Sequence, residues 1–240
     1  MLTDRQIQLL KAVIREYTTT SIPVGSVEIV KKYNLKCSAA TVRNEMAKLI
    51  ELGFLDMLHT SSGRVPTKNA YRFYLDELME EEELPVLQEV AMKQRLWPNR
   101  FHFEKLLRES VISLSDMTKY LAIATIDDGF VVHAGARNVL DNKEFWEIDV
   151  AKAALMLIDD YSLLERIFQS VPYGGEVKVA LEDELGMENL NRCTMLFTPY
   201  SSGSRKGYIS ILGPSRMNYG VVIPAVRYTK ELIEELGESW

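Results

Sequence analysis

The chain has 240 residues, which is long enough for two domains that each bury a hydrophobic core. Its formal net charge of -6 argues against a DNA-binding protein only if the charge is spread evenly. It is not, because residues 1–76 carry eleven Lys and Arg against seven Asp and Glu, a net charge of +4, which leaves -10 for residues 77–240. This asymmetry is expected of a nucleic-acid-binding head joined to an acidic body.

Other features of the composition exclude several classes of protein. The two cysteines, Cys37 and Cys193, fall in different predicted domains, so a disulfide is not expected, and no Cys/His cluster has metal-ligand spacing. No apolar run approaches the roughly 20 residues that a membrane-spanning helix needs, and no signal peptide is recognised. Nucleophile elbows and phosphate-binding loops are also missing from the sequence. We expect a cytoplasmic protein that is not an enzyme, has no cofactor or metal ion, and does not enter a membrane.

The segment from Ser38 to Gly53 is the most informative part of the chain. It begins with a serine that can cap a helix and ends with a glycine that tolerates left-handed geometry, so it predicts one helix of about four turns. At about 100° per residue, the side expected to face the core carries Val42, Glu45, Met46, Leu49 and Gly53. The opposite side carries Ala40, Asn44, Ala47, Lys48 and Glu51, with Thr41 and Arg43 at its borders. This side is either an ordinary solvated face or a surface that enters a groove of DNA.

The residues around this helix complete the pattern of a winged helix-turn-helix. An amphipathic helix is predicted over residues 4–17 after a cap at Thr3, and a short helix over residues 27–33 after a cap at Ser26. Residues 34–37 then connect to the Ser38 helix, which is the helix-turn-helix spacing. Residues 54–59 alternate as a short strand, residues 60–63 form a turn, and residues 64–67 can return as a second strand, which would make the wing.

The candidate DNA contacts lie on this helix and on the predicted hairpin. Arg43 and Asn44 have the donor and acceptor geometry for base edges. Hydroxyl groups and cations suit phosphates, and alanines let a backbone approach closely. The remaining candidates on these grounds are Ser38, Ala39, Ala40, Thr41, Lys48, Thr60, Ser61, Ser62 and Arg64.

The rest of the chain predicts an α+β domain behind a helical linker. A helix is expected over residues 69–83, and the four carboxylates of residues 80–83 at its end are interpreted as a solvated linker. A second amphipathic helix is expected over residues 103–119. Its apolar stripe belongs either to the core or to a dimer interface. Strands and helices follow in a mostly antiparallel arrangement. Strands are predicted at 121–126, 130–136, 176–181, 194–199 and 207–212, and helical segments at 145–158, 163–168 and 222–236. The predicted domains are 1–79 (winged-helix DNA-binding), 80–119 (helical linker) and 120–240.

Residues 38–79, with the sequence SAATVRNEMAKLIELGFLDMLHTSSGRVPTKNAYRFYLDELM, closely resemble the DNA-binding domain of the HrcA family of bacterial heat-inducible transcription repressors. The runs LFTPY at 196–200 and GPSRMNY at 213–219 resemble the C-terminal motifs of the same family. The resemblance implies a GAF-like C-terminal domain and a homodimer that binds double-stranded DNA at an inverted-repeat operator ahead of chaperone genes. It also implies relief of repression by heat and support of activity by the chaperonin.

The chain departs from this family in three places. The family usually has a subdomain inserted into the GAF-like sheet that helps the subunits pair, whereas the corresponding place here is the short turn at residues 127–129. Dimerisation is then expected to be weaker or to use another surface, such as the linker helices or the GAF-like face. Ala70 stands where the family usually has glycine. Val27 and Glu28 stand where the family usually has an arginine after Gly25 and Ser26, and the absence of this arginine removes one phosphate contact.

Two other functions remain open from the sequence. The first is a ligand-sensing one-component transcription regulator with a small-molecule pocket in the GAF-like domain. The residues around the candidate pocket, however, are also typical of turns that precede a helix. The residues that would line this pocket are Tyr200, Arg205, Arg216, Asn218 and Tyr219. The second is a protein-interaction module whose winged helix contacts protein, and specific operator binding would exclude it.

Overall fold

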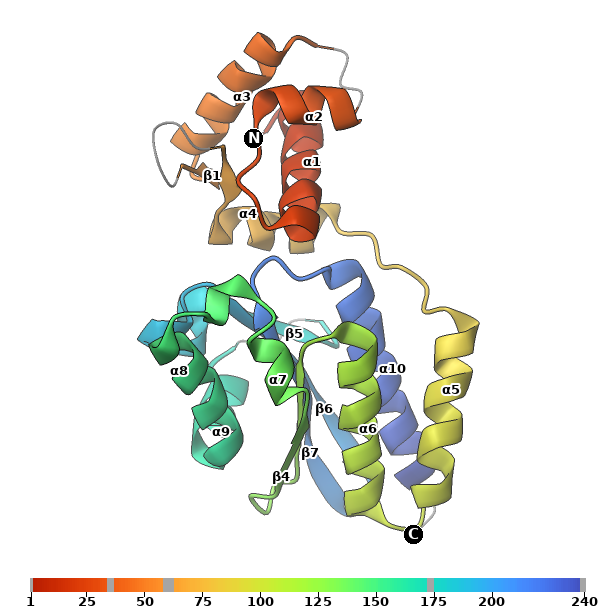
Figure 1. Cartoon of the computed structure of the whole chain (residues 1–240). Helices are drawn as coiled ribbons and strands as arrows, with labels where there is room; N and C mark the ends of the chain where they lie inside the picture. The colour runs from red at the N-terminus through yellow and green to blue at the C-terminus, as the bar shows by residue number, and fades with distance from the viewer. Residues whose placement is uncertain (1, 34–36, 58–62, 172–174, 238–240) are drawn as a thin grey trace. The chain divides into compact units, whose positions relative to one another are not determined.

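The structure is a computed structural model that describes residues 2–33, 37–57, 63–171 and 175–237. Contacts divide the chain into two compact units (Figure 1). The first consists of residues 1–80 with Arg216–Asn218, and the second of residues 81–215 with 219–240. The helices in the range 80–119, which the sequence assigned to a linker, therefore belong by their contacts to the second unit.

The first unit is a helical domain with a small hairpin, as predicted. Its core is made of apolar side chains from three helices and from the hairpin, including Leu10, Ile29, Val42, Leu49 and Val65. Its elements are α1 (Asp4–Thr20), α2 (Ser26–Tyr33), α3 (Ala39–Glu51), β1 (Leu55–Asp56), β2 (Val65–Pro66) and α4 (Lys68–Phe73), which continues as a π-helical turn, Tyr74–Leu78.

The ends of these helices follow the predicted capping residues with two differences. Thr3 caps α1 in a capping box with Gln6, as expected. Ser26 is the first residue of α2 and not its cap, because the carbonyl oxygen of Gly25 already accepts the amide of Ile29 at 3.1 Å. The helix predicted over residues 69–83 ends at Leu78, since Met79 has extended dihedral angles.

The hairpin confirms the predicted pair of strands. Leu55 pairs with Pro66 and Asp56 with Val65 in an antiparallel register. Val24 extends this sheet by pairing with Arg64, with N–H···O distances of 2.8 and 2.9 Å. Gly63 is required at this point, because a Cβ atom there would lie 2.5 Å from the backbone of Pro23.

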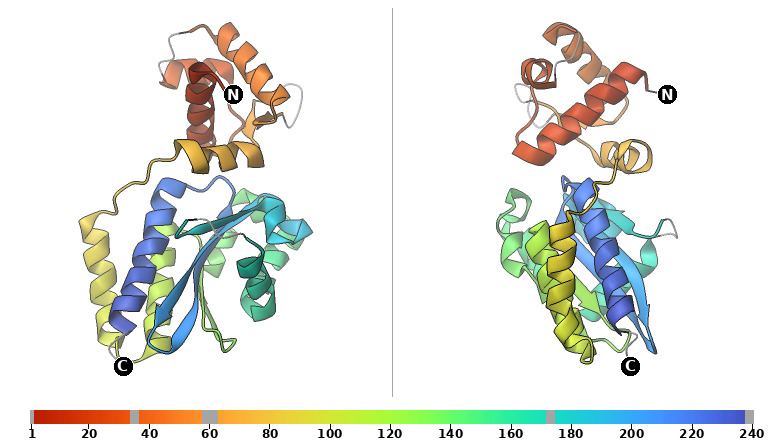
Figure 2. Two further views of the ribbon diagram at one scale, coloured as in Figure 1. Left: turned by 180° about the vertical axis from the view of Figure 1, so that it is seen from behind. Right: turned by 90° about the vertical axis from the view of Figure 1, so that its right-hand side faces the viewer.

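The second unit is a five-stranded sheet covered by helices on both faces (Figure 2). The strand order is β4-β3-β7-β6-β5, and every pair of neighbours is antiparallel, which confirms the predicted α+β class. The strands are β3 (Leu121–Thr125), β4 (Val131–Ala134), β5 (Lys178–Leu181), β6 (Cys193–Ser202) and β7 (Arg205–Pro214). The helices are α5 (Val86–Leu96), α6 (Phe103–Thr118), α7 (Ala136–Val139), α8 (Ile148–Asp159), α9 (Tyr161–Ser170) and α10 (Tyr219–Gly237).

Both faces of the sheet are buried, so its central strands are mostly apolar, and the exposed polar residues of β6 and β7 lie at the ends that meet in their turn. On β3, Leu121 and Ile123 face the core cluster formed with α8 and α9, and the alternate residues face α6 and α10. The apolar stripe of α6 thus belongs to the core of this unit. Helix α5 forms an outer layer on α6 and α10.

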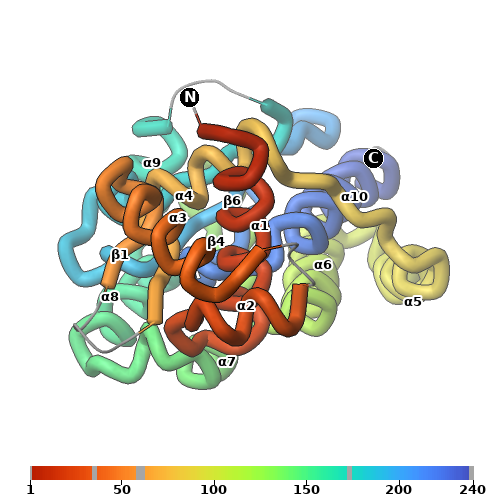
Figure 3. The backbone as a smooth tube through the Cα atoms, turned by 90° about the horizontal axis from the view of Figure 1, so that it is seen from above, coloured from red at the N-terminus to blue at the C-terminus, as the bar shows by residue number. Residues whose placement is uncertain are grey.

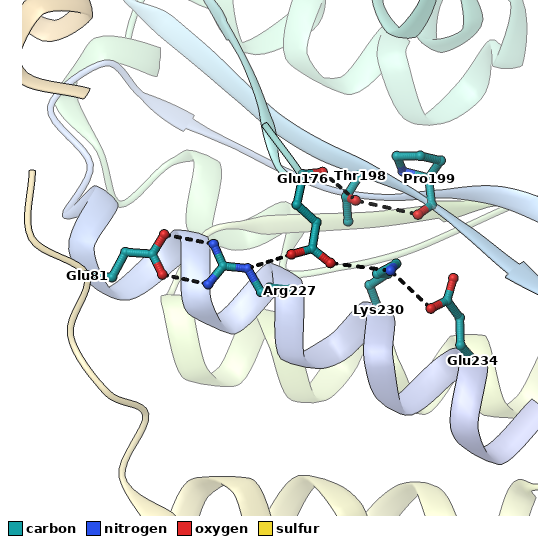
Figure 4. A network of polar contacts seen from close by, with 7 residues as sticks. All are labelled: Glu81, Glu176, Thr198, Pro199, Arg227, Lys230 and Glu234. Atoms are coloured by element: carbon teal, nitrogen blue, oxygen red, sulfur yellow. Dashed lines mark hydrogen bonds and ion pairs between the residues drawn. The ribbon is translucent and has the colours of Figure 1, made fainter. Parts of the chain in front are cut away.

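Part of the acidic segment that follows the first unit is fixed by specific contacts. Glu81 accepts two hydrogen bonds from Arg227 of α10, at 2.6 and 2.7 Å, and these bonds hold the pKa of its carboxyl below the usual range. Arg227 and Lys230 share Glu176, and Lys230 also pairs with Glu234 (Figure 4). The solvated-linker prediction is therefore wrong for Glu81.

A proline inside α10 explains why the backbone docks at the same place. Pro224 has no N–H group, so the carbonyl oxygen of Gly220 lacks its helical donor. The amide of Glu82 supplies that hydrogen bond at 2.9 Å. The segment is thus attached to α10 by a backbone hydrogen bond as well as by ion pairs.

Gly63→Ala should separate the base of the hairpin from Val24. The new Cβ would meet backbone atoms of Pro23 and Val24 at 2.5 to 2.7 Å, and backbone atoms cannot move aside cheaply. We expect the free energy of unfolding to fall by about 1–3 kcal/mol, and the Arg64 amide to lose protection from hydrogen exchange. Gly25→Ala is the matched control, because its Cβ would have nothing within 4 Å. Unchanged protection of Arg64 would contradict the close contact.

Gly207→Ala should destabilise the second unit. A Cβ at this position would lie 1.8 Å from the carbonyl oxygen of Thr125, which also accepts the hydroxyl of Tyr200 at 2.6 Å. We expect a loss of about 3 kcal/mol in urea unfolding, the upper part of the range for overpacking. Ser204→Ala, in the exposed turn between β6 and β7, should change stability by less than about 0.5 kcal/mol. Equal effects of the two substitutions would show that the sheet can relax around Gly207.

Candidate nucleic-acid interface

Helix α3 has the two-sided character that its sequence predicts. Val42, Met46 and Leu49 are buried against α1 and α2. The opposite side, with Ala40, Asn44, Ala47, Lys48 and Glu51, is exposed. Arg43 is exposed beside it, whereas Ala39 and Thr41 are half-buried. The predicted division into a core side and an outer side is confirmed.

The start of α3 is closed by two of the candidate hydroxyl groups. The Oγ atom of Ser38 accepts the amide of Thr41 at 3.1 Å, and the two side-chain oxygens lie 2.9 Å apart, within hydrogen-bond distance. Ser38 therefore satisfies one of the amides at the N-terminus of the helix. Any contact of these two residues with a phosphate is added to this capping role.

Arg43 and Asn44 are differently placed, since their side chains are exposed and make no hydrogen bond or ion pair within the described part of the chain. Arg43 and Asn44 lie one helical turn from Ala40 and Ala47, whose small side chains project little from the helix. A long cation and an amide on such a surface can reach base edges in a groove. This arrangement is the observation that most favours DNA as the partner.

Lys48 is held by a neighbour that the sequence analysis did not consider. Its ammonium lies 3.1 Å from a carboxylate oxygen of Glu45, and this hydrogen bond lowers the pKa of Glu45. The same carboxylate accepts the side-chain amide of Gln6 at 3.1 Å. The i,i+3 spacing of Glu45 and Lys48 was the available signal for the first contact. No local signal pointed to Gln6, which is 39 residues away in sequence.

The wing candidates are only partly located. Thr60, Ser61 and Ser62 lie outside the described residues. Arg64 is half-buried at the base of the hairpin, in the segment that pairs with Val24, and not at the tip.

A buried carboxylate holds α2 in place. Glu16 of α1 is almost fully buried, accepts the hydroxyl of Tyr33 at 3.0 Å and pairs with Lys32 at 2.7 Å. Burial, followed by the hydrogen bond to Glu16, raises the pKa of Tyr33 to about 12. Tyr33 ends α2, so this contact fixes the end of the helix that leads toward α3. This contact was not predicted, although an acid on the apolar side of α1 was a signal in the sequence.

The residues proposed for a small-molecule pocket are not brought together. Tyr200 donates to the carbonyl of Thr125, whereas Tyr219 donates to the carbonyl of Ser215 and lies 3.4 Å from Thr194. Thr194 and Tyr200 are six residues apart on β6, which is roughly 20 Å along a strand. The prediction that these residues line one pocket is therefore wrong, because both hydroxyls donate to backbone carbonyl groups near opposite ends of β6.

The described residues also show no arrangement for a metal ion, since no three His, Cys, Asp or Glu side chains gather as ligands. In the same part of the chain, no helix has the length and apolar character needed to span a bilayer.

Two family profiles match the chain, and both describe the same family. "Winged helix-turn-helix transcription repressor, HrcA DNA-binding" matches residues 1–79, and "HrcA protein C terminal domain" matches residues 125–223. Together they cover the first unit and most of the sheet of the second.

Individual relatives agree with these profiles. The heat-inducible transcription repressor HrcA of Acetivibrio thermocellus is 24% identical over 336 positions, covering 98% of this chain and 96% of the relative. That of Moorella thermoacetica is 25% identical over 338 positions, with 98% of each chain covered. That of Listeria monocytogenes is 35% identical over 174 positions, which is 72% of this chain and 49% of the relative.

One solved structure supports the fold over the whole length. The crystal structure of a hypothetical protein superposes with a TM-score of 0.80 at 19% sequence identity, covering 100% of this chain and 99% of the other. At this identity the likeness concerns the fold alone, an N-terminal winged helix followed by a GAF-like α+β domain.

The long alignments also show that the chain is shorter than these relatives. An alignment of 336 positions with a chain of 240 residues leaves at least 96 positions where this chain has no residue, and they are internal because both chains are covered almost to their ends. The sequence predicts this difference at residues 127–129, where the structure has only the short turn between β3 and β4. With two matching profiles, near full-length relatives and a winged helix followed by a GAF-like domain, the chain belongs to the HrcA family of heat-inducible transcription repressors.

Proposed function

We propose that this chain represses chaperone genes by binding an inverted-repeat operator as a dimer, with one α3 helix in the major groove of each half-site. The exposed side of α3 carries the proposal, since Arg43 and Asn44 are outward and make no contact within the described residues. The net charge of +4 on residues 1–76 favours a DNA backbone over a protein partner. We place this activity in the cytoplasm, where the bacterial chromosome lies.

The contacts divide into two kinds. Arg43 and Asn44 read base edges, and the low surface of Ala39, Ala40 and Ala47 lets α3 approach the groove. Phosphates are held by α3, through Ser38, Thr41 and Lys48, and by the predicted hairpin, through Thr60, Ser61, Ser62 and Arg64. On binding, the ammonium of Lys48 leaves Glu45 for a phosphate, and the loss of the first ion pair lowers the net contribution of Lys48 to the binding free energy.

The symmetry of the operator follows from the dimer. Two identical heads related by a two-fold axis contact half-sites of opposite direction, about one helical turn or a multiple of it apart. A single head makes few phosphate contacts, so the affinity of the second head depends on its attachment to the first.

The proposed response to heat rests on the relatives, which are named heat-inducible repressors. Warming unfolds the second unit, the heads are no longer held as a pair, and the operator is released. Refolding of that unit with help from the chaperonin would restore repression. The level of repression would then depend on the concentration of free chaperonin.

Operator binding tests the division of roles on α3. We expect Arg43→Ala and Asn44→Ala each to weaken binding by about 1–3 kcal/mol and to relax sequence preference. Lys48→Ala should weaken binding to all sequences alike and reduce the slope of log affinity against log salt by about 1 or less. The measurement is a fluorescence anisotropy titration against an inverted-repeat duplex and a scrambled duplex at two salt concentrations.

Glu51→Gln is the matched control, because Glu51 is exposed on the same side of α3 at its end. It should keep the wild-type preference for the inverted repeat. Equal weak binding of the wild-type protein to both duplexes would reject the repressor proposal for that operator. A change of sequence preference in Lys48→Ala would reverse the assigned roles.

Release by heat should follow unfolding of the second unit. We expect the temperature of half-release from the operator to coincide with the unfolding midpoint followed by tryptophan fluorescence, because Trp97 and Trp146 lie in that unit. Gly207→Ala, which strains only this unit, should lower both temperatures by the same amount. Ser204→Ala should lower neither. Release at an unchanged temperature in Gly207→Ala would separate repression from the stability of the second unit.

A further inference from the structure

The outer side of α5 is an apolar surface that the second unit leaves uncovered. Val86 and Leu87 are 71% and 80% exposed, and Val90, Trp97 and Phe101 on α5 and the following turn are also exposed. Helical spacing puts Val86, Val90 and Trp97 on one side of α5 with Leu87 at its border, while Met92 and Leu96 on the other side are buried. The right-hand view of Figure 2 shows α5 at the outside of the second unit, beside α6 and α10.

The inner side of α5 is firmly attached, so its outer side has a defined orientation. Lys93 pairs with Glu235 of α10 at 2.7 Å, and the hydroxyl of Tyr228 donates to the carbonyl of Glu89. Arg95 pairs with Glu109 and with Asp116 of α6. The tube in Figure 3 shows the same arrangement, with α5 at the edge beside α6.

The charges at the two ends of this surface are opposite. Glu83, just before α5, is exposed and has no ion-pair partner in the described part of the chain. At the other end the guanidinium carbon of Arg100 lies 4.4 Å from the ring centroid of Trp97 and 4.3 Å from that of Phe101. No described carboxylate pairs with Arg100, which leaves its charge available beside two exposed rings.

We propose that two copies of this chain pair through α5, antiparallel and related by a two-fold axis, and this inference rests on the proposed dimeric repressor. In an antiparallel pair the start of one α5 lies beside the end of the other, so each Glu83 comes near the Arg100 of the partner subunit. The same surface serves on both chains, as an isologous interface requires. A second copy of the chain fits this surface because the surface is complementary to itself.

A second exposed apolar cluster, around α8, does not have this property. It includes Leu140, Trp146, Ile148 and Met156. The exposed charges on α8 and at the residue before it are mostly acidic, with Glu147, Asp149 and Asp159 against Lys152. Two copies of this surface would bring like charges together, which opposes self-association.

The oligomeric state in solution, without DNA, tests the inference. We expect the wild-type chain to be dimeric by light scattering, and Leu87→Glu with Val90→Glu to be monomeric at the same concentration with an unchanged circular dichroism spectrum. Ile148→Glu with Met156→Glu is the matched control on the α8 surface and should remain dimeric. A monomeric wild-type chain, a dimeric α5 variant or a monomeric α8 variant would overturn the assignment to α5.

Charge reversal tests the antiparallel direction. Glu83→Arg and Arg100→Glu should each raise the dimer dissociation constant at least tenfold, and the double variant should return it to within about threefold of the wild-type value. A double variant that is weaker than both single variants would reject the pairing of Glu83 with Arg100.

A duplex with one half-site distinguishes failure of this inference from failure of the repressor proposal. The monomeric α5 variant should bind one half-site as tightly as the wild-type chain does and lose only the added affinity for the full inverted repeat. Wild-type protein that prefers neither duplex to a scrambled sequence would reject the repressor proposal while leaving the result on the dimer surface valid.

Discussion

The rotation of α3 about its own axis decides which side chains can reach DNA, and the burial of Val42, Met46 and Leu49 sets that rotation. A change of one residue in the register of this stripe would turn α3 by about 100° and move Arg43 and Asn44 away from the surface that Ala40 and Ala47 keep low. Glu45 supports the same orientation from the border of the stripe, since it accepts a hydrogen bond from Gln6 of α1. The candidate interface is thus a consequence of packing inside the first unit, and the exposed side chains add chemistry to an orientation set by the buried ones.

Periodicity and capping were sufficient to predict most elements of both units, but α5 and α7 were not predicted. The alternation of apolar residues places α1, α3, α6 and the strands, because each element buries one side and helical and strand periods differ. The contacts between distant segments could not be predicted in this way. Glu16 with Tyr33, Gln6 with Glu45, and Glu81 with Arg227 join residues that local periodicity does not relate. The error at Tyr200 and Tyr219 has the same origin, since the sequence motifs did not show that Tyr200 lies six positions along β6 from Thr194, the residue that Tyr219 contacts.

The attachment of the acidic segment to α10 shows how a local rule can have a distant effect. Pro224 breaks the hydrogen-bond ladder of α10 at Gly220, and the unused carbonyl becomes the acceptor for Glu82. The ion pairs of Glu81, Arg227 and Glu176 lie beside this bond, and such partly exposed pairs contribute only about 0–1 kcal/mol each. Their value here is geometric, because they fix where the chain enters the second unit and therefore where α5 begins.

A dimer built on α5 would be small, and its size has consequences for the proposed switch. The 11 residues of α5 span roughly 16 Å, which is short for an interface that typically buries about 800 Å² on each partner. A weak dimer in solution would become a tight complex on an inverted repeat, because binding of one head would raise the effective concentration of the other. The same linkage would make release steep on warming, since each second unit that unfolds would remove a surface needed by two heads. This chain lacks at least 96 positions that its long relatives have. Its dimer would therefore be held together partly by the operator that both heads bind.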